Sequence, residues 1–84
     1  MYVVCLRLRR GAPLPWSVTR TPDRDGAVDA FADFVNCAAL DRMDFEVEFI
    51  CVGKVVAVHR FMAPAGSGHD WRGRIAELWA SLLE

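Results

Sequence analysis

Apolar and polar residues alternate along residues 2–9 and 44–52, which is the pattern of half-buried β-strands. A third, largely apolar stretch follows at residues 55–62. Gly53 and Lys54 separate the last two segments, and a glycine at the first position of a two-residue loop suits a type II′ hairpin turn. The pattern therefore predicts three strands, of which the second and third form a hairpin.

The register of this hairpin decides which side chains share a face of the sheet. A type II′ turn sets Glu48 opposite His59, whereas a three-residue loop sets Glu46 opposite Arg60. A shift of one residue moves every side chain of a strand to the other face, so the two registers predict different surfaces. We expect the type II′ register.

Two further segments space their apolar residues by three and four positions, as amphipathic helices do. The first begins at Thr21-Pro22-Asp23, where a hydroxyl, a proline and an acid suit a helix start, and runs to about Leu40. Asp25-Gly26 is the alternative start. The second helix follows Asp70, a good N-cap residue. Its apolar face consists of Trp71, Ile75, Leu78, Trp79 and Leu82.

The order of these elements predicts an α+β fold of the form β-α-β-β-α. A chain of 84 residues has room for a single domain, residues 1–84. The simplest closed arrangement is a three-stranded, mainly antiparallel sheet with both helices packed on one face. It resembles a ferredoxin-like fold that lacks its last strand, and this topological likeness implies no function.

Composition excludes some classes of protein. An apolar fraction of 54% and a mean hydropathy of +0.18 exclude a disordered chain and are high for so small a domain. No apolar run approaches the roughly 20 residues that a membrane-spanning helix needs. The N-terminal arginines follow the apolar stretch, which is the reverse of a signal peptide. We therefore expect a cytoplasmic protein without a membrane partner.

Residues with metal-binding or catalytic chemistry do not occur at the spacings that such sites need. The three cysteines form no close-spaced pair, which is typical of free thiols in a reducing compartment. Ser67, His69 and Asp70 have the residue types of a hydrolase triad, but triad members come from distant parts of a chain. The Gly-Ser-Gly motif at residues 66–68 lacks a Walker lysine. We expect no catalytic residue, no metal and no cofactor.

The net charge of −1 conceals an uneven distribution along the chain. Residues 1–22 carry four arginines and no acid, whereas residues 23–48 carry a net charge of −6. Asp25, Asp29 and Asp33 repeat every four residues on the polar side of the first predicted helix. They form either an acidic stripe that docks on a basic surface or an ordinary solvated helix face.

The favoured register gives the sheet an outer face with an apolar centre and a charged rim, as in a protein interface. The centre consists of Ile50, Val52, Val55, Ala57 and Phe61, and Arg7, Arg9, Glu46, Glu48 and His59 lie around it. If the helices cover opposite faces of the sheet, the same residues form ordinary core. Trp16 lies in a proline-rich loop, residues 10–22, and is either an anchor for a partner or a lid over the core.

We therefore expect a small non-enzymatic protein-interaction module that binds another protein or a second copy of itself. Nine of the ten basic residues are arginine, a composition typical of GC-rich bacterial or phage genomes. A narrower expectation is a phage or mobile-element inhibitor that blocks a host complex, as anti-CRISPR proteins do.

Two alternatives stay open. One is an RNA- or DNA-binding accessory domain that uses the arginine-rich first strand, although Glu46 and Glu48 on the same face argue against a nucleic-acid partner. The other is a small ligand-binding or enzymatic domain built on residues 66–70.

Overall fold

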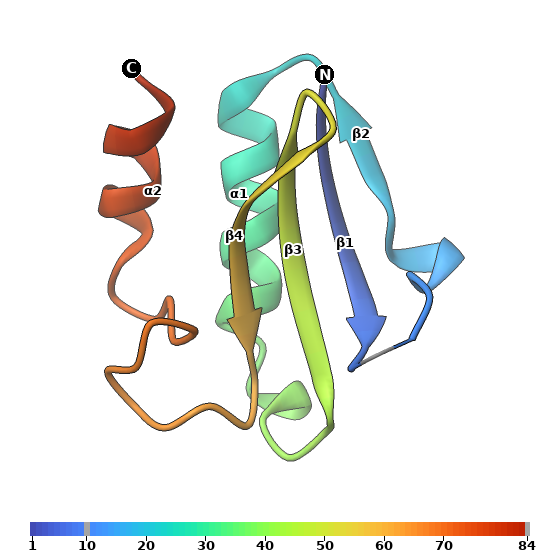
Figure 1. The fold of residues 1–84 in the computed structure, drawn as a ribbon, viewed down its shortest axis with the longest axis vertical. Coiled ribbons are helices and arrows are strands. Elements are labelled where there is room, and N and C mark those ends of the chain that lie inside the picture. The colour runs from blue at the N-terminus through green and yellow to red at the C-terminus, as the bar shows by residue number, and fades with distance from the viewer. Residues whose placement is uncertain (10, 84) are drawn as a thin grey trace.

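The sheet of the computed structural model has four strands in the order β2-β1-β3-β4, with every neighbouring pair antiparallel (Figure 1). The strands are β1 (Tyr2–Leu8), β2 (Thr19–Thr21), β3 (Phe45–Cys51) and β4 (Lys54–Arg60). The helices are α1 (Arg24–Val35) and α2 (Ile75–Leu82), with short 3-10 turns η1 (Pro15–Ser17) and η2 (Ala38–Leu40). The structure describes every residue except 10 and 84. The predicted α+β class with an antiparallel sheet and two helices is confirmed, but the predicted number of strands is wrong.

The additional strand is β2, which lies in the segment predicted to be a loop. Its three residues are too few to show an alternating pattern, so the sequence gives little sign of it. The buried Ser17 hydroxyl fastens the preceding turn to β1, because its Oγ lies 3.0 Å from the Leu6 N and 2.7 Å from the Leu14 carbonyl oxygen. These bonds bring the chain back alongside β1, where β2 pairs with it.

The additional strand also changes the topology. Because β2 and β3 both run antiparallel to β1, they are parallel to each other and flank it. The helix α1 therefore joins β2 to β3 across β1, instead of joining the first strand to the next one. The expected ferredoxin-like arrangement with three strands is wrong for this reason.

The helix α1 begins two residues after the predicted start, with Asp23 and not Thr21 as its N-cap residue, and it ends earlier than predicted. The Asp23 carboxylate accepts hydrogen bonds from the backbone N–H groups of Asp25 and Gly26, at 3.2 and 3.1 Å, and so caps the helix. The helix ends at Val35 instead of Leu40, with Asn36 as the C-cap residue. Asparagine is a poor residue for a helix interior because its side chain competes for backbone hydrogen bonds.

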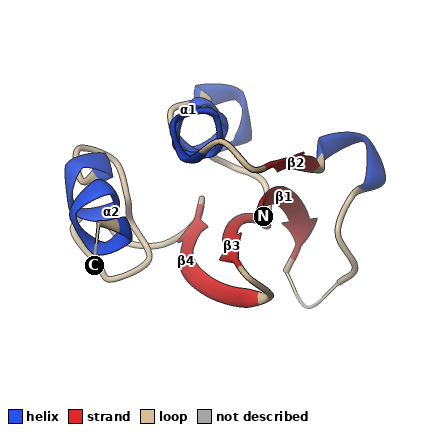
Figure 2. Cartoon of the chain, turned by 90° about the horizontal axis from the view of Figure 1, so that it is seen from above, coloured by secondary structure: helices blue, strands red, loops and turns tan. Residues whose placement is uncertain are grey.

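The second helix begins later than predicted. The Asp70 carboxylate accepts hydrogen bonds from the backbone N–H groups of Gly66 and Arg72, so it caps a turn and not the helix. Gly73 then has a φ of +75°, a left-handed conformation that interrupts helical geometry, and α2 starts at Ile75. Figure 2 shows α1 over one face of the sheet and α2 beside α1 near β4. We call the sheet face away from α1 the outer face.

The hairpin register differs from the type II′ prediction. Val52 and Gly53 have φ values of +51° and +75°, which is the left-handed geometry of a type I′ turn, and Cys51 pairs with Lys54. A bulge then shifts the pairing between Phe49 and Ile50 by one residue. Beyond the bulge the pairs are Glu48 with Val58, Val47 with His59, and Glu46 with Arg60.

The bulge decides which side of β4 faces the core. Without the extra residue, the turn would place His59 opposite Glu46 on the outer face and would turn Arg60 inward. With it, His59 and Phe61 lie on the α1 side, at 2% and 8% exposure. The predicted pair of Glu48 with His59 is wrong, and the alternative pair of Glu46 with Arg60 is present.

The core lies between α1 and the inner face of the sheet. Phe31 of α1 stands edge-on to Phe49 of β3, with ring centroids 5.8 Å apart. The predicted apolar centre of the outer face thus loses Ala57 and Phe61 to the core. Of its other members, Val52 and Val55 are exposed and Ile50 is half-buried.

Two neighbouring residues test this register. We expect Phe61→Asp to lower the free energy of unfolding by at least about 3 kcal/mol, because the carboxylate would be buried without a partner. Met62 is 63% exposed, so Met62→Asp is the matched control and changes stability by no more than about 0.5 kcal/mol. Urea denaturation measures both. Equal stability of the two variants would contradict the assignment of Phe61 to the core.

Candidate functional site

Three of the charged residues predicted on the outer face, Arg7, Glu46 and Glu48, form ion pairs with one another, and Arg60 joins them. Glu46 and Glu48 are only 8% and 9% exposed. The Arg7 guanidinium lies 3.1 Å from the Glu48 carboxylate and 3.6 Å from that of Glu46, and the Arg60 Nε donates to Glu46 at 3.1 Å. The hydrogen bond to Glu48 raises the pKa of Arg7. These four side chains therefore stabilise the fold, because burial of either carboxylate without a cation would cost several kcal/mol.

The thiol of Cys5 lies beside this network and is buried. Its Sγ is 4.0 Å from a Glu48 oxygen. Burial raises the pKa of Cys5, and the negative charge of Glu48 adds to the rise. The reactive thiolate is therefore disfavoured at neutral pH.

Trp16 is not a lid over the core. Its side chain is 74% exposed on the turn η1, which the buried hydroxyl of Ser17 ties to β1 and to Leu14. An exposed tryptophan on an ordered turn is the kind of residue that anchors a partner, because little conformational freedom is lost on binding. The structure thus provides the exposure that the anchor interpretation requires.

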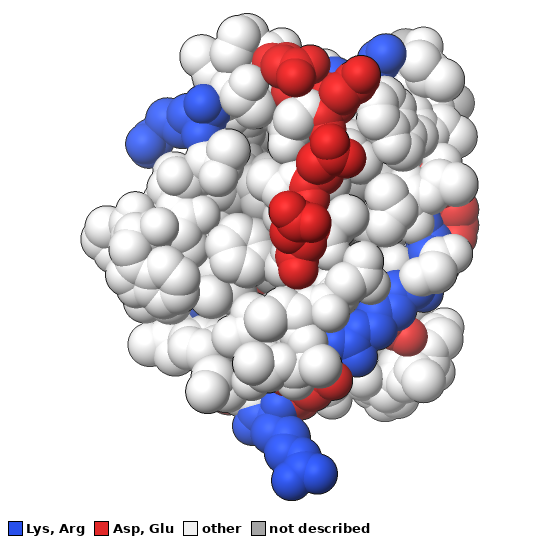
Figure 3. All heavy atoms as spheres, turned by 180° about the vertical axis from the view of Figure 1, so that it is seen from behind, with Lys and Arg blue, Asp and Glu red and all other residues white. Residues whose placement is uncertain are grey.

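The three aspartates of α1 face solvent together. Figure 3 shows a line of acidic side chains on the face of the molecule that carries α1. Asp25, Asp29 and Asp33 are all exposed, and we call them the acidic stripe. Within the described residues, none of the three carboxylates takes part in an ion pair or side-chain hydrogen bond.

His59 lies in the core instead of on the predicted charged rim. Its Nδ1 accepts a hydrogen bond from the Trp71 backbone N–H at 3.0 Å, and its ring stands edge-on to Phe61 with centroids 4.8 Å apart. The Nε2 is buried and has no partner among the described residues. Because Nδ1 accepts this bond, the ring is neutral with its proton on Nε2.

Burial is the main reason why the pKa of His59 lies below its ordinary value of 6.5. The positive charge of Arg72 lowers the pKa further, while the carboxylates of Asp70 and Asp41 oppose the shift. A protonated imidazole has no lone pair for the Trp71 N–H. Acid should therefore break the bond that attaches the Trp71 segment to β4.

The loop at residues 66–70 is folded on itself. The Gly66 N–H donates to the Asp70 carboxylate at 2.8 Å, so it is not free to bind a phosphate group. This hydrogen bond, followed by that of the Arg72 N–H, lowers the pKa of Asp70. Of the residue types that a triad would need, Ser67, His69 and Asp70, the aspartate is instead used to cap this turn.

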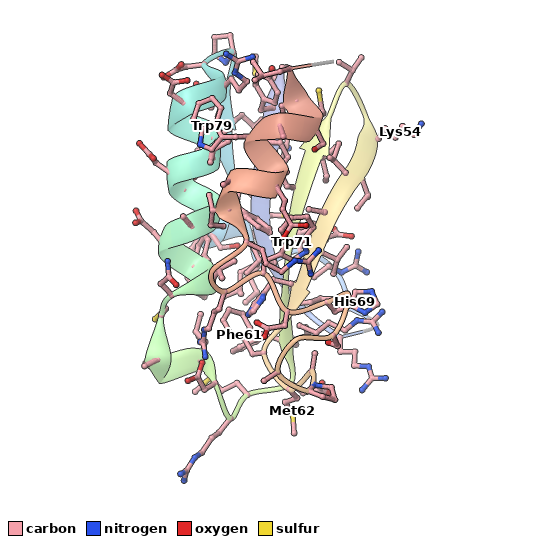
Figure 4. All side chains as sticks on the ribbon, turned by 90° about the vertical axis from the view of Figure 1, so that its left-hand side faces the viewer. Lys54, Phe61, Met62, His69, Trp71 and Trp79 are labelled. Carbon is pink, nitrogen blue, oxygen red and sulfur yellow. The ribbon has the colours of Figure 1, made fainter. Side chains whose placement is uncertain are left out.

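The same loop forms one wall of a pocket with a volume of about 270 Å³. Arg9, Asp44 and Arg60 line it as well. Figure 4 shows His69 on the side of β4 away from α1, far from Trp79. The sequence singled out Arg9 and the 66–70 loop, but missed Arg60 and Asp44. The alternative hairpin register was the only signal that placed Arg60 on the outer face.

No three side chains among His, Cys, Asp and Glu gather within the described residues in a way that could hold a metal ion. No helix in residues 1–9 and 11–83 is both long and apolar enough to cross a membrane.

The pKa of His59 gives a prediction for stability. The unfolded chain takes up a proton near pH 6.5, while the buried folded-state ring resists it, so stability falls as pH drops through 6.5. We expect this group to contribute a slope of at most about 1.4 kcal/mol per pH unit, between pH 6.5 and its folded-state pKa. His59→Asn keeps an acceptor for the Trp71 N–H and should lose this slope, whereas His69→Gln should retain it. Urea denaturation at a series of pH values measures it, and identical slopes in wild type and His59→Asn would refute the assignment.

Comparisons with protein-family models, with curated protein sequences and with solved structures found no match to this chain.

Proposed function

We propose that this chain is a small non-enzymatic protein-interaction module that uses its acidic stripe to dock on a basic protein surface. The observation that carries the proposal is that these three carboxylates face solvent in a row without a partner among the described residues. Of the other described acids, Asp44 likewise lacks a side-chain partner, and the rest behave differently. Glu46 and Glu48 are held by arginines, and Asp23 and Asp70 cap turns or helices.

The acidic stripe makes α1 less stable than a neutral face would. Like charges four residues apart on a helix repel by about 0.2–0.5 kcal/mol per pair. Asp33 also lies in the last turn of α1, where a negative charge opposes the helix dipole. Only Asp25, in the first turn, interacts favourably with the dipole, so a binding role would explain the other two charges.

The narrower form of the proposal is an inhibitor. A row of carboxylates can occupy a basic surface that otherwise binds the phosphates of a nucleic acid. A phage or mobile-element protein that blocks a host complex in this way, as anti-CRISPR proteins do, is a function of this kind. The exposed Trp16 would add an apolar anchor to such a complex.

Nucleic acid itself is the weaker candidate for the partner. Arg7, the central arginine of the first strand, is committed to Glu46 and Glu48. Those two carboxylates also place negative charge in the middle of the face that a nucleic acid would need.

Two double variants separate a binding role from a structural one. We expect D29N/D33N to raise the free energy of unfolding by about 0.5 kcal/mol, because it removes repulsion and an unfavourable dipole interaction. The same variant should weaken binding of a fluorescent oligo-arginine peptide by roughly tenfold at low salt. Fluorescence anisotropy measures the affinity, and thermal denaturation measures the stability.

The matched control is D44N/E77Q, which also removes two exposed negative charges but lies outside the acidic stripe. It should leave peptide affinity close to that of the wild type. Equal losses of affinity in the two double variants would mean that only the total charge matters. In that case the acidic stripe is not a docking surface.

A further inference from the structure

The pocket beneath the 61–69 loop gathers two arginines and a histidine from three separate parts of the chain. Arg9 follows β1, Arg60 ends β4, and His69 belongs to the loop before α2. Figure 4 shows Met62 and His69 at the same end of the molecule. The sequence separates these residues by up to 60 positions, so only the fold brings them together.

Backbone hydrogen bonds hold the walls of the pocket in place. The Arg60 N–H donates to the His69 carbonyl oxygen at 2.9 Å, which ties the loop to the end of β4. The Arg9 N–H donates to the Asp44 carbonyl oxygen at 3.0 Å, which ties the end of β1 to the start of β3. The backbone positions from which these side chains extend are therefore fixed before any ligand arrives, which lowers the entropy lost on binding.

The hydrogen-bond donors of these side chains are largely unused. Arg60 donates only its Nε, to Glu46, and its two terminal nitrogens have no partner among the described residues. Among the described residues, the guanidinium of Arg9 and the imidazole of His69 likewise have no side-chain hydrogen-bond or ion-pair partner. Of the residues that the structure describes, Asp44 is the one acid that lines the pocket.

We propose that this pocket binds a small phosphate-bearing ligand. Guanidinium groups present forked N–H donors that match the oxygens of a phosphate group. The apolar side chains of Phe45, Met62 and Pro64 line the rest of the pocket and can cover a short carbon portion of the ligand. A volume of about 270 Å³ is at the lower end for small-molecule sites, so it suits a phosphate with a few carbon atoms.

The recognition would come from side chains and not from the Gly-Ser-Gly motif. The Gly66 N–H, the donor that such a motif would offer, already bonds to Asp70. The proposed site is also separate from the acidic stripe, which belongs to α1. A test of phosphate binding at this pocket therefore does not depend on whether the acidic stripe docks on a protein.

The test is a titration with inorganic phosphate and with phenyl phosphate, followed by ¹H–¹⁵N NMR, with chloride at matched ionic strength as the reference. We expect saturating shifts at Arg9, Arg60 and His69, with a Kd of roughly 1 mM or below for phenyl phosphate. Arg9→Gln should weaken binding roughly tenfold, because it removes charge-assisted hydrogen bonds.

Arg20→Gln is the matched control, since Arg20 is an exposed arginine on β2 that does not line the pocket. It should bind phenyl phosphate as the wild type does. His69→Gln is the second pocket variant if Arg9→Gln gives a spectrum of an unfolded chain. Shifts that do not saturate, shifts that chloride reproduces, or equal affinity of pocket variants and the control would each overturn the proposal.

Discussion

Two carboxylates on the central strand β3 control how the sheet is assembled. Glu46 and Glu48 are more than nine-tenths buried, and burial of a carboxylate without a cation would cost several kcal/mol. Arg7 on β1 lies against both of them, and Arg60 on β4 reaches Glu46. Both neighbours of β3 must therefore pair with it in a register that brings an arginine to the outer face.

This requirement extends to parts of the molecule far from the carboxylates. On β4, the bulge near Ile50 turns Arg60 outward, and the same shift turns His59 inward. The inward His59 then accepts the Trp71 N–H and attaches the segment before α2 to the sheet. The outward Arg60 faces the pocket beneath the loop. The core, the attachment of α2 and the proposed phosphate site thus share one structural cause.

Periodicity in the sequence was enough to predict β1, β3, β4 and the first helix, because their apolar faces are long. It did not predict β2, whose three residues have no apolar face and pair with β1 after the Ser17 hydroxyl has tied the preceding turn to that strand. It also missed the bulge, since an extra residue in a run of valines leaves no trace in the pattern. The acidic stripe follows from helical spacing alone, whereas the pocket depends on the register and could not be predicted from the sequence.

The hairpin register can be measured directly by cross-strand nuclear Overhauser contacts between backbone protons of β3 and β4. The structure predicts contacts between Val47 and His59 and between Glu46 and Arg60. Contacts between Glu46 and His59 instead would mean that the bulge is absent and that His59 lies on the outer face. That result would contradict the core, the neutral state of His59 and the pocket together.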